Sequence, residues 1–158
     1  MNKYFNDAVI GNGTISASYT KNGELLRLYY PTIDYRQFVD FFNVGIKVND
    51  SNIIYTHKDV NNLYSQYYVE DTNILKTEIF NTYFRVKLIQ TDFCPIKENV
   101  IVKRYKFKNE NTIDLELNFL VHSKLLTNNN NQVSGYKKDD VLLQFFVFRY
   151  RKIILVML

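Results

Sequence analysis

Apolar and polar residues alternate along most of this 158-residue chain, which predicts β-strands with one buried and one solvent-facing side. In the segment 14–20, for example, every second residue is apolar. Asn22-Gly23 then separates this segment from a second strand pattern that ends at Pro31. An Asn-Gly pair favours the two positive φ values of a type I′ turn. We therefore predict a β-hairpin over residues 12–31.

Further strand patterns follow at short intervals, separated by connections rich in Asn and Asp that favour turns. The last two predicted strands, 100–107 and 113–121, are expected to form a hairpin that turns at 109–111. No ten-residue window has convincing helical spacing, and the best helical candidate is the short segment from Tyr35 to Phe42. The predicted strands after the first hairpin are 44–48, 53–55, 64–69, 74–80, 83–92, 100–107 and 113–121.

About ten short strands joined by turns are typical of a large antiparallel β-sandwich. We expect an all-β fold with little helix, and one domain over residues 1–146. The segment from Phe145 to Leu158 differs from the rest, because eleven of its fourteen residues are apolar or aromatic and it lacks turn signals. One interpretation of residues 147–158 is an edge strand with a tail. We favour another, in which this tail results from truncation or a shifted reading frame.

Charge and cysteine content narrow the possible functions. The formal charge is +4, but Arg149, Arg151 and Lys152 supply three of these charges and leave +1 on the preceding residues. Interspersed signs along the sequence argue against nucleic-acid binding. A single cysteine, Cys94, excludes a disulfide framework. No secretory signal or membrane-spanning segment is visible, so we expect a soluble, cytoplasmic protein without a membrane partner.

The residue types needed for several kinds of catalysis are present without the required spacing. His57, His122 and Cys94 do not form a metal-binding pattern, and ordinary sheet or core positions explain them. Nucleophile elbows and phosphate-binding glycine loops do not occur. Carboxylate pairs for glycoside hydrolysis could be drawn from the sixteen acidic residues, but turn and strand-end positions account for these equally well. We therefore predict no catalytic residue, no metal site and no cofactor.

One aromatic segment remains a candidate for binding. Six aromatic residues between Tyr29 and Phe42 surround an arginine and two aspartates. Aromatic rings stack on sugar faces, and charged groups hydrogen-bond to sugar hydroxyls. We favour packing in a core or interface as the explanation for these rings. The candidate substrate-binding residues are Tyr30, Asp34, Tyr35 and Arg36.

Three motifs in order carry a resemblance to a known family. They are Ile10-Gly11-Asn12-Gly13, Asn22-Gly23-Glu24 and Leu28-Tyr29-Tyr30-Pro31, followed by Val102, Arg104 and Asn109. Together they resemble the opening of bacterial and archaeal glycoside hydrolase family 15 proteins, the glucoamylase-like enzymes, over roughly residues 8–121. The segment after Pro31 departs from the family's pattern.

The resemblance implies a mutarotase-like super-sandwich that precedes and supports an (α/α)₆ catalytic barrel. In the parent protein the barrel hydrolyses α-glucosidic bonds with inversion and carries both catalytic glutamates. No position of this chain matches either glutamate, so we expect the chain to be inactive alone. The expected partners are the barrel and an α-glucan oligosaccharide. Two alternatives remain: an independent carbohydrate-binding module, or a small mutarotase-like enzyme with a histidine and a carboxylate in one cleft.

Overall fold

The protein is all-β, as the alternating pattern predicts. The computed structural model describes residues 6–35, 37–125, 137–147 and 150–157, and beyond residue 124 it describes the backbone only. The described residues form strands and no helix, and every strand pair is antiparallel. The strands are β1 (Ala8–Gly11), β2 (Ser16–Tyr19), β3 (Leu25–Tyr29), β4 (Val39–Val48), β5 (Ile54–Tyr55), β6 (Asn62–Tyr68), β7 (Ile74–Asn81), β8 (Val86–Phe93), β9 (Ile101–Asn109), β10 (Leu115–Leu125), β11 (Lys137–Val147) and β12 (Tyr150–Met157).

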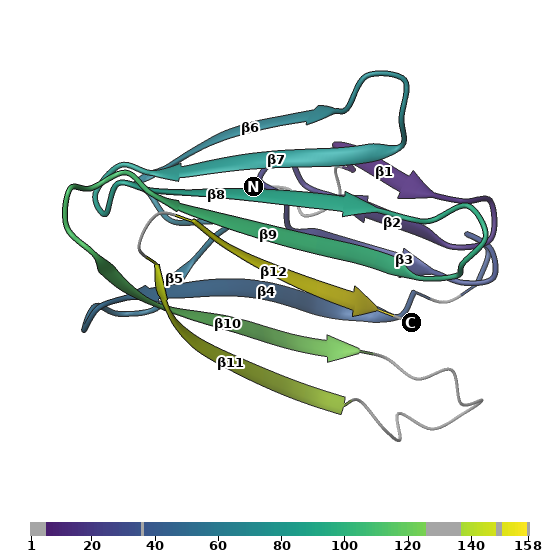
Figure 1. Cartoon of the computed structure of the whole chain (residues 1–158). Coiled ribbons are helices and arrows are strands. Elements are labelled where there is room, and N and C mark those ends of the chain that lie inside the picture. The colour runs from purple at the N-terminus through teal and green to yellow at the C-terminus, as the bar shows by residue number, and fades with distance from the viewer. Residues whose placement is uncertain (1–5, 36, 126–136, 148–149, 158) are drawn as a thin grey trace.

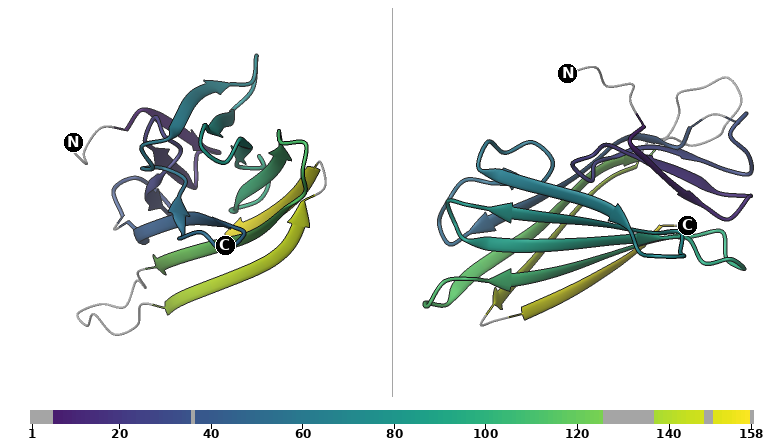
Figure 2. Two further views of the ribbon diagram at one scale, coloured as in Figure 1. Left: turned by 90° about the vertical axis from the view of Figure 1, so that its left-hand side faces the viewer. Right: turned by 90° about the horizontal axis from the view of Figure 1, so that it is seen from above.

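The strands form three sheets, of which the two larger ones make the sandwich. A five-stranded sheet has the order β12-β9-β8-β7-β6, and a four-stranded sheet has the order β11-β10-β4-β5. Figure 1 shows the four-stranded sheet below the five-stranded one, and Figure 2 shows the two layers from the side. A three-stranded sheet, β1-β2-β3, contacts β7 and β8 through β1 and contacts β4 through β3.

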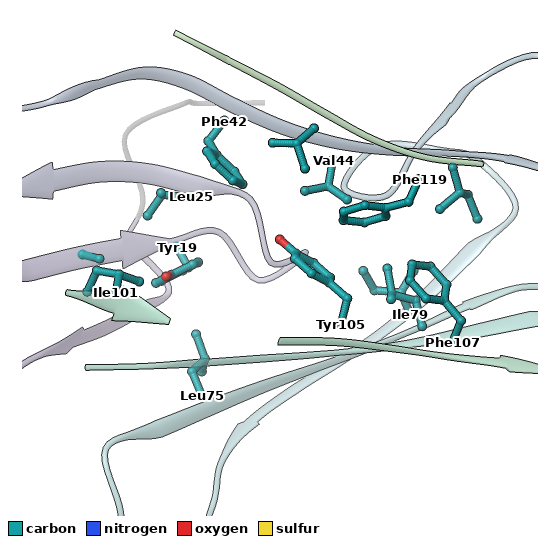
Figure 3. Close-up of a cluster of buried hydrophobic side chains, with 14 of the residues drawn as sticks. Tyr19, Leu25, Phe42, Val44, Leu75, Ile79, Ile101, Tyr105, Phe107 and Phe119 are labelled. Carbon is teal, nitrogen blue, oxygen red and sulfur yellow. The ribbon is translucent and has the colours of Figure 1, made fainter. Parts of the chain in front are cut away.

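The core between the two layers is built from the inward-facing residues of each strand. Tyr105 and Phe107 of β9 meet Phe119 of β10, and the ring centroids lie 5.0 and 5.6 Å apart. All three side chains are fully buried (Figure 3). Pairs of aromatic rings at such distances stabilise a core beyond the area that they bury. These rings hold β9 and β10, and therefore the two layers, together.

The first hairpin forms as predicted, but its turn differs. β2 pairs with β3, Gly23 has φ 82°, and Asn22 does not have a positive φ. The Gly23 N–H donates to the Thr20 carbonyl (2.9 Å), and the Thr20 N–H donates to the Glu24 carbonyl (3.0 Å). This is a three-residue loop, a type I turn followed by a left-handed glycine. The type I′ prediction was wrong because the strands shift register next to the loop.

A second expectation from the sequence, the hairpin that turns at 109–111, was also wrong. Strands 101–109 and 115–125 do not form a hairpin, since β9 and β10 belong to different sheets and the chain crosses between layers at 110–114. The helical candidate from Tyr35 to Phe42 is not a helix, and its second half is the beginning of β4. Alternation predicted both strands of the first pair correctly, but it carries no information about which neighbour each strand takes.

The C-terminal segment forms strands in the structure. β11 pairs with β10 over residues 137–147, and residues 150–157 form β12, which pairs with β9. These two strands are the outer strands of the four-stranded and five-stranded sheets, respectively. The division of the chain into a domain over 1–146 and an aberrant tail over 147–158 stays a prediction.

Candidate functional site

Asn12, in the first of the motifs that resemble glycoside hydrolase family 15, is a structural clamp. Its Oδ1 accepts hydrogen bonds from the N–H groups of Thr14 and Ile15, both at 3.0 Å, and so closes the turn between β1 and β2. Its Nδ2 donates to the carbonyls of Pro95 (3.2 Å) and Glu98 (3.0 Å), in the loop between β8 and β9. One side-chain amide therefore forms hydrogen bonds with backbone groups of both a local turn and a distant loop.

The outer edge of β1 is closed by side chains. The Tyr68 hydroxyl accepts from the Val9 N–H and donates to the Val9 carbonyl, both at 2.8 Å. The Asn73 side chain donates to the Gly11 carbonyl. Unpaired edge groups are a template for association with another strand, and these contacts satisfy them internally. At Gly11 a Cβ would meet the Ile15 carbonyl oxygen, so the turn requires glycine there.

The tip of the first hairpin is fixed in the same way, by amides from the five-stranded sheet. Gln66 Nε2 donates to the Thr20 carbonyl and Gln90 Nε2 donates to the Gly23 carbonyl, both at 2.9 Å. A Cβ on Gly23 would lie 3.1 Å from the Thr77 side chain, so the glycine also allows close packing. The Asn22-Gly23 and Asn12 motifs therefore have structural roles.

A buried ion pair lies next to this hairpin and was missed by the sequence reasoning. Lys103 Nζ is 2.6 Å from Asp92 Oδ1, and the side chains are 1% and 0% exposed. Gln90 Nε2 donates to Asp92 Oδ2 at 2.6 Å, and the lysine ammonium lies 4.6 Å from the centroid of the Tyr19 ring. A signal was present, because Lys103 shares its phase with the apolar residues Ile101, Tyr105 and Phe107 of the same strand.

This cluster has shifted proton affinities but no access to a substrate. Burial raises the pKa of the Asp92 carboxyl and lowers that of the Lys103 ammonium, and the attraction within the pair opposes both shifts. Burial, followed by the charge of Asp92, raises the pKa of the Tyr19 hydroxyl well above its ordinary value. Groups without exposed surface cannot touch a sugar in this structure. The cluster therefore has a structural role.

The predicted sugar-binding residues lie together on the loop that follows β3. Tyr30 and Tyr35 are 42% and 50% exposed, and Asp34 is also exposed. Arg36 lies outside the described residues. The larger aromatic group divides here: Phe42 points into the core, where its ring lies 5.6 Å from the Lys103 ammonium. A role of Tyr30, Asp34, Tyr35 and Arg36 in binding stays a prediction.

A shallow hollow of about 300 Å³ adjoins this loop. Its lining is neutral, with hydroxyls from Thr14, Ser16 and Thr32 beside aliphatic side chains that include Ile33. The side chains of Tyr30, Asp34 and Tyr35 do not line it. Hydroxyls together with aliphatic surface suit a neutral polar ligand better than a charged one.

The histidines and the cysteine occupy separate places. His57 Nε2 lies 3.7 Å from Glu24 Oε1, its side chain is 11% exposed, and burial lowers its pKa although Glu24 opposes this shift. Neither residue lines the hollow beside Thr32. His122 packs edge-on against Phe41 with centroids 4.8 Å apart. Cys94 is buried, and burial raises the pKa of its thiol. Within the described ranges, no three His, Cys, Asp or Glu side chains gather around a possible metal position.

Comparisons with known proteins agree with the broad class suggested by the motifs. No protein-family model matches the sequence. Over 111 residues, or 70% of this chain, the sequence is 32% identical to an uncharacterized glycosyl hydrolase of Methanocaldococcus jannaschii. The match covers 17% of that relative, so the chain spans a small part of its length. This chain is thus related to a part of a glycosyl hydrolase.

Among the residues for which the structure gives a placement, no helix has the length and apolar character to cross a bilayer.

Proposed function

We propose that this chain is the non-catalytic N-terminal β-sandwich, over residues 1–146, of a glucoamylase-like glycoside hydrolase. In the parent protein it supports an (α/α)₆ barrel that hydrolyses α-glucosidic bonds. The observation that carries this proposal is the 32% identity to a glycosyl hydrolase of which the match covers only 17%. The remaining 83% of such a protein leaves ample chain for a catalytic domain.

The structural roles of the motif residues support the same proposal. Asn12 and Gly23 bind other parts of the sandwich, and the ion pair between Asp92 and Lys103 is closed to solvent. Glycoside hydrolysis requires two carboxyl groups on either side of a bound sugar. The hollow beside Thr32 contains no carboxylate in its lining. A supporting role does not require carboxylates beside a bound sugar.

The test separates support from catalysis. The Methanocaldococcus relative is expressed with and without its matched segment, and hydrolysis of maltooligosaccharides and thermal stability are measured. We expect loss of the segment to lower the midpoint of thermal unfolding and to reduce activity by destabilising the remainder. The purified chain studied here should show no turnover of the same sugars. Turnover by this chain alone, or an unchanged relative without the segment, would contradict the proposal.

One observation favours a second candidate, an independent carbohydrate-binding module. Tyr30 and Tyr35 are half-exposed on one loop, beside the neutral hollow at Thr32 and Ile33. Exposed rings next to hydroxyls are suited to stacking on a sugar and bonding to its hydroxyls.

Calorimetry with maltoheptaose distinguishes this module from the supporting domain. For a binding module we expect measurable heat of binding. Tyr30→Ala and Tyr35→Ala should each weaken the affinity by about five- to thirtyfold, because loss of a stacked ring costs roughly 1–2 kcal/mol. Tyr83→Ala is a matched control, because Tyr83 is 73% exposed and lies in the loop between β7 and β8. Absence of binding by the unmodified chain removes this candidate.

A further inference from the structure

The pleat of the five-stranded sheet separates charges that the sequence intersperses. Successive side chains of a strand point to opposite faces, and the inward residues of β7, β8 and β9 are buried in the sandwich. The outward residues of the same strands include five cations and a single carboxylate, that of Glu78. The cations are Lys76, Lys87, Arg104, Lys106 and Lys108. We call this outward side the cationic face.

The strand register brings these cations close to one another. Lys87 of β8 is directly opposite Lys108 of β9, and Lys76 and Arg104 both neighbour Thr91 in one row across β7, β8 and β9. Like charges directly opposite in a sheet are unfavourable. Glu78 and Glu110 relieve this repulsion through ion pairs with Lys87 at 2.6 Å and with Lys108 at 2.8 Å, respectively. The face still carries more positive than negative side chains, and an acidic partner would complement this excess.

An apolar row crosses the same face at one end. Ile74, Phe93 and Val102 are directly aligned on β7, β8 and β9, and all three are only partly buried. Leu63, on the edge strand β6 and opposite Phe80 at the other end of β7, is 61% exposed. Cations beside an apolar row match a protein surface that combines apolar and charged groups. A polyanion such as nucleic acid would leave this row without a partner.

On the other layer, the described outward side chains of β4 and β10 lack this bias. On β4 and β10 the outward cations Lys47 and Lys124 are balanced by Glu116 and by Asp40, which forms an ion pair with Lys124. The charge difference between the two faces therefore does not follow from the composition of the chain. It belongs to the side of the five-stranded sheet that faces away from the core.

We infer that the cationic face is the surface through which this sandwich docks onto an acidic, partly apolar surface of the remainder of the longer hydrolase. The inference rests on the proposed function, because it takes the remainder of the glycosyl hydrolase as the partner. It adds which side of the domain makes the contact and which charges the partner presents. Complementary charges would orient the two parts and exclude other docking geometries.

The experiment uses coexpression, so that the partner can fold on this chain. The intact chain carries an affinity tag and is coexpressed with the Methanocaldococcus relative lacking its matched segment. Copurification is measured, and the complex is then washed at 50 and 500 mM NaCl. The unmodified chain should retain the partner at low salt and lose most of it at high salt, because exposed charge pairs are screened.

Charge reversal locates the docking surface. Arg104→Glu/Lys106→Glu should reduce retention at least about tenfold, and Lys76→Glu/Lys106→Glu provides a second variant if the first does not fold. Lys21→Glu/Lys97→Glu is the matched control, because both lysines are exposed outside this face. It should retain the partner like the unmodified chain. Circular dichroism and thermal unfolding of each variant confirm that the fold is intact.

The remaining outcomes separate the two proposals. If the partner is retained equally by the cationic-face variants and the control, the docking surface is wrong and the supporting function stands. If the unmodified chain retains no partner, the supporting function fails and this inference fails with it. Binding of heparin or a single-stranded oligonucleotide in preference to the partner, abolished by the same variants, would replace the protein partner by a polyanion.

Discussion

Lys103 Nζ lies 2.6 Å from Asp92 Oδ1 in the interior of the sandwich, where neither side chain has more than 1% of its surface exposed. Taking two charges out of water is unfavourable, and their attraction compensates only when the remaining polar groups are satisfied. Gln90 supplies the second hydrogen bond to the carboxylate and also holds the Gly23 carbonyl at the hairpin tip. The pair therefore connects the first hairpin with β8 and β9.

Removal of one partner should destabilise the protein strongly. We expect Lys103→Met to lower the free energy of unfolding by about 3–5 kcal/mol, because it leaves a carboxyl group buried without its cation. The double variant Asp92→Asn/Lys103→Met should lose less than Lys103→Met alone, since no charge then remains. Urea unfolding of the two single variants and the double variant measures this coupling. Additive losses would show that the two charges do not stabilise each other.

The Asn12 clamp can be divided into its accepting and donating halves. Asn12→Ala removes both, and we expect a loss of about 2–3 kcal/mol from several hydrogen bonds of roughly 1 kcal/mol each. Asn12→Asp keeps the oxygen that closes the turn but places a second oxygen against the carbonyls of Pro95 and Glu98. It should therefore cost nearly as much as the alanine variant in urea unfolding. An aspartate variant as stable as the unmodified chain would contradict the role of the donating half.

His57 should make the stability of the protein dependent on pH. Burial lowers the pKa of this imidazole in the folded chain below its ordinary value of 6.5. As the pH falls through 6.5, the unfolded chain binds the proton first, so the free energy of unfolding decreases until the folded pKa is reached. His57→Gln should flatten this decrease between pH 7.5 and 5.5, measured by urea unfolding. An equally steep decrease in the variant would assign it to other groups.

Alternation along the sequence predicted most strands because one face of each strand is buried. The alternation also places Lys103 on the buried face, in phase with Ile101 and Tyr105. A lysine at such a position is not expected to be buried, so the pattern alone did not identify it. The partner Asp92 is equally buried on the next strand of the sheet. Its distance from Lys103 depends on the pairing of β8 with β9, which a single sequence does not specify.

The same limit explains the incorrect hairpin between β9 and β10. Leu115, Leu117 and Phe119 are buried as predicted, but burial is the same whether the strand pairs with β9 or faces it across the core. The exposed Ile113, at 66%, shows that the apolar phase begins only after the crossing. The cationic face was missed for a related reason. The net charge counted along the sequence sums over both faces of each strand, whereas the pleat places these charges on one face only.

Deletion of residues 147–158 tests whether strand β12 is part of the fold. From the sequence alone, deletion of this apolar tail should improve solubility, since the body has a charge of only +1 and an unsupported apolar strand favours association. In the structure, however, residues 150–157 pair with β9 along its whole edge from Ile101 to Lys108. Deletion would expose that edge, which lies next to the cationic face. We therefore expect the shortened chain to unfold at lower urea concentration and to associate more in sedimentation experiments. A shortened chain that is equally stable and more soluble would support the interpretation of this segment as an aberrant tail, because β9 would then not need its partner.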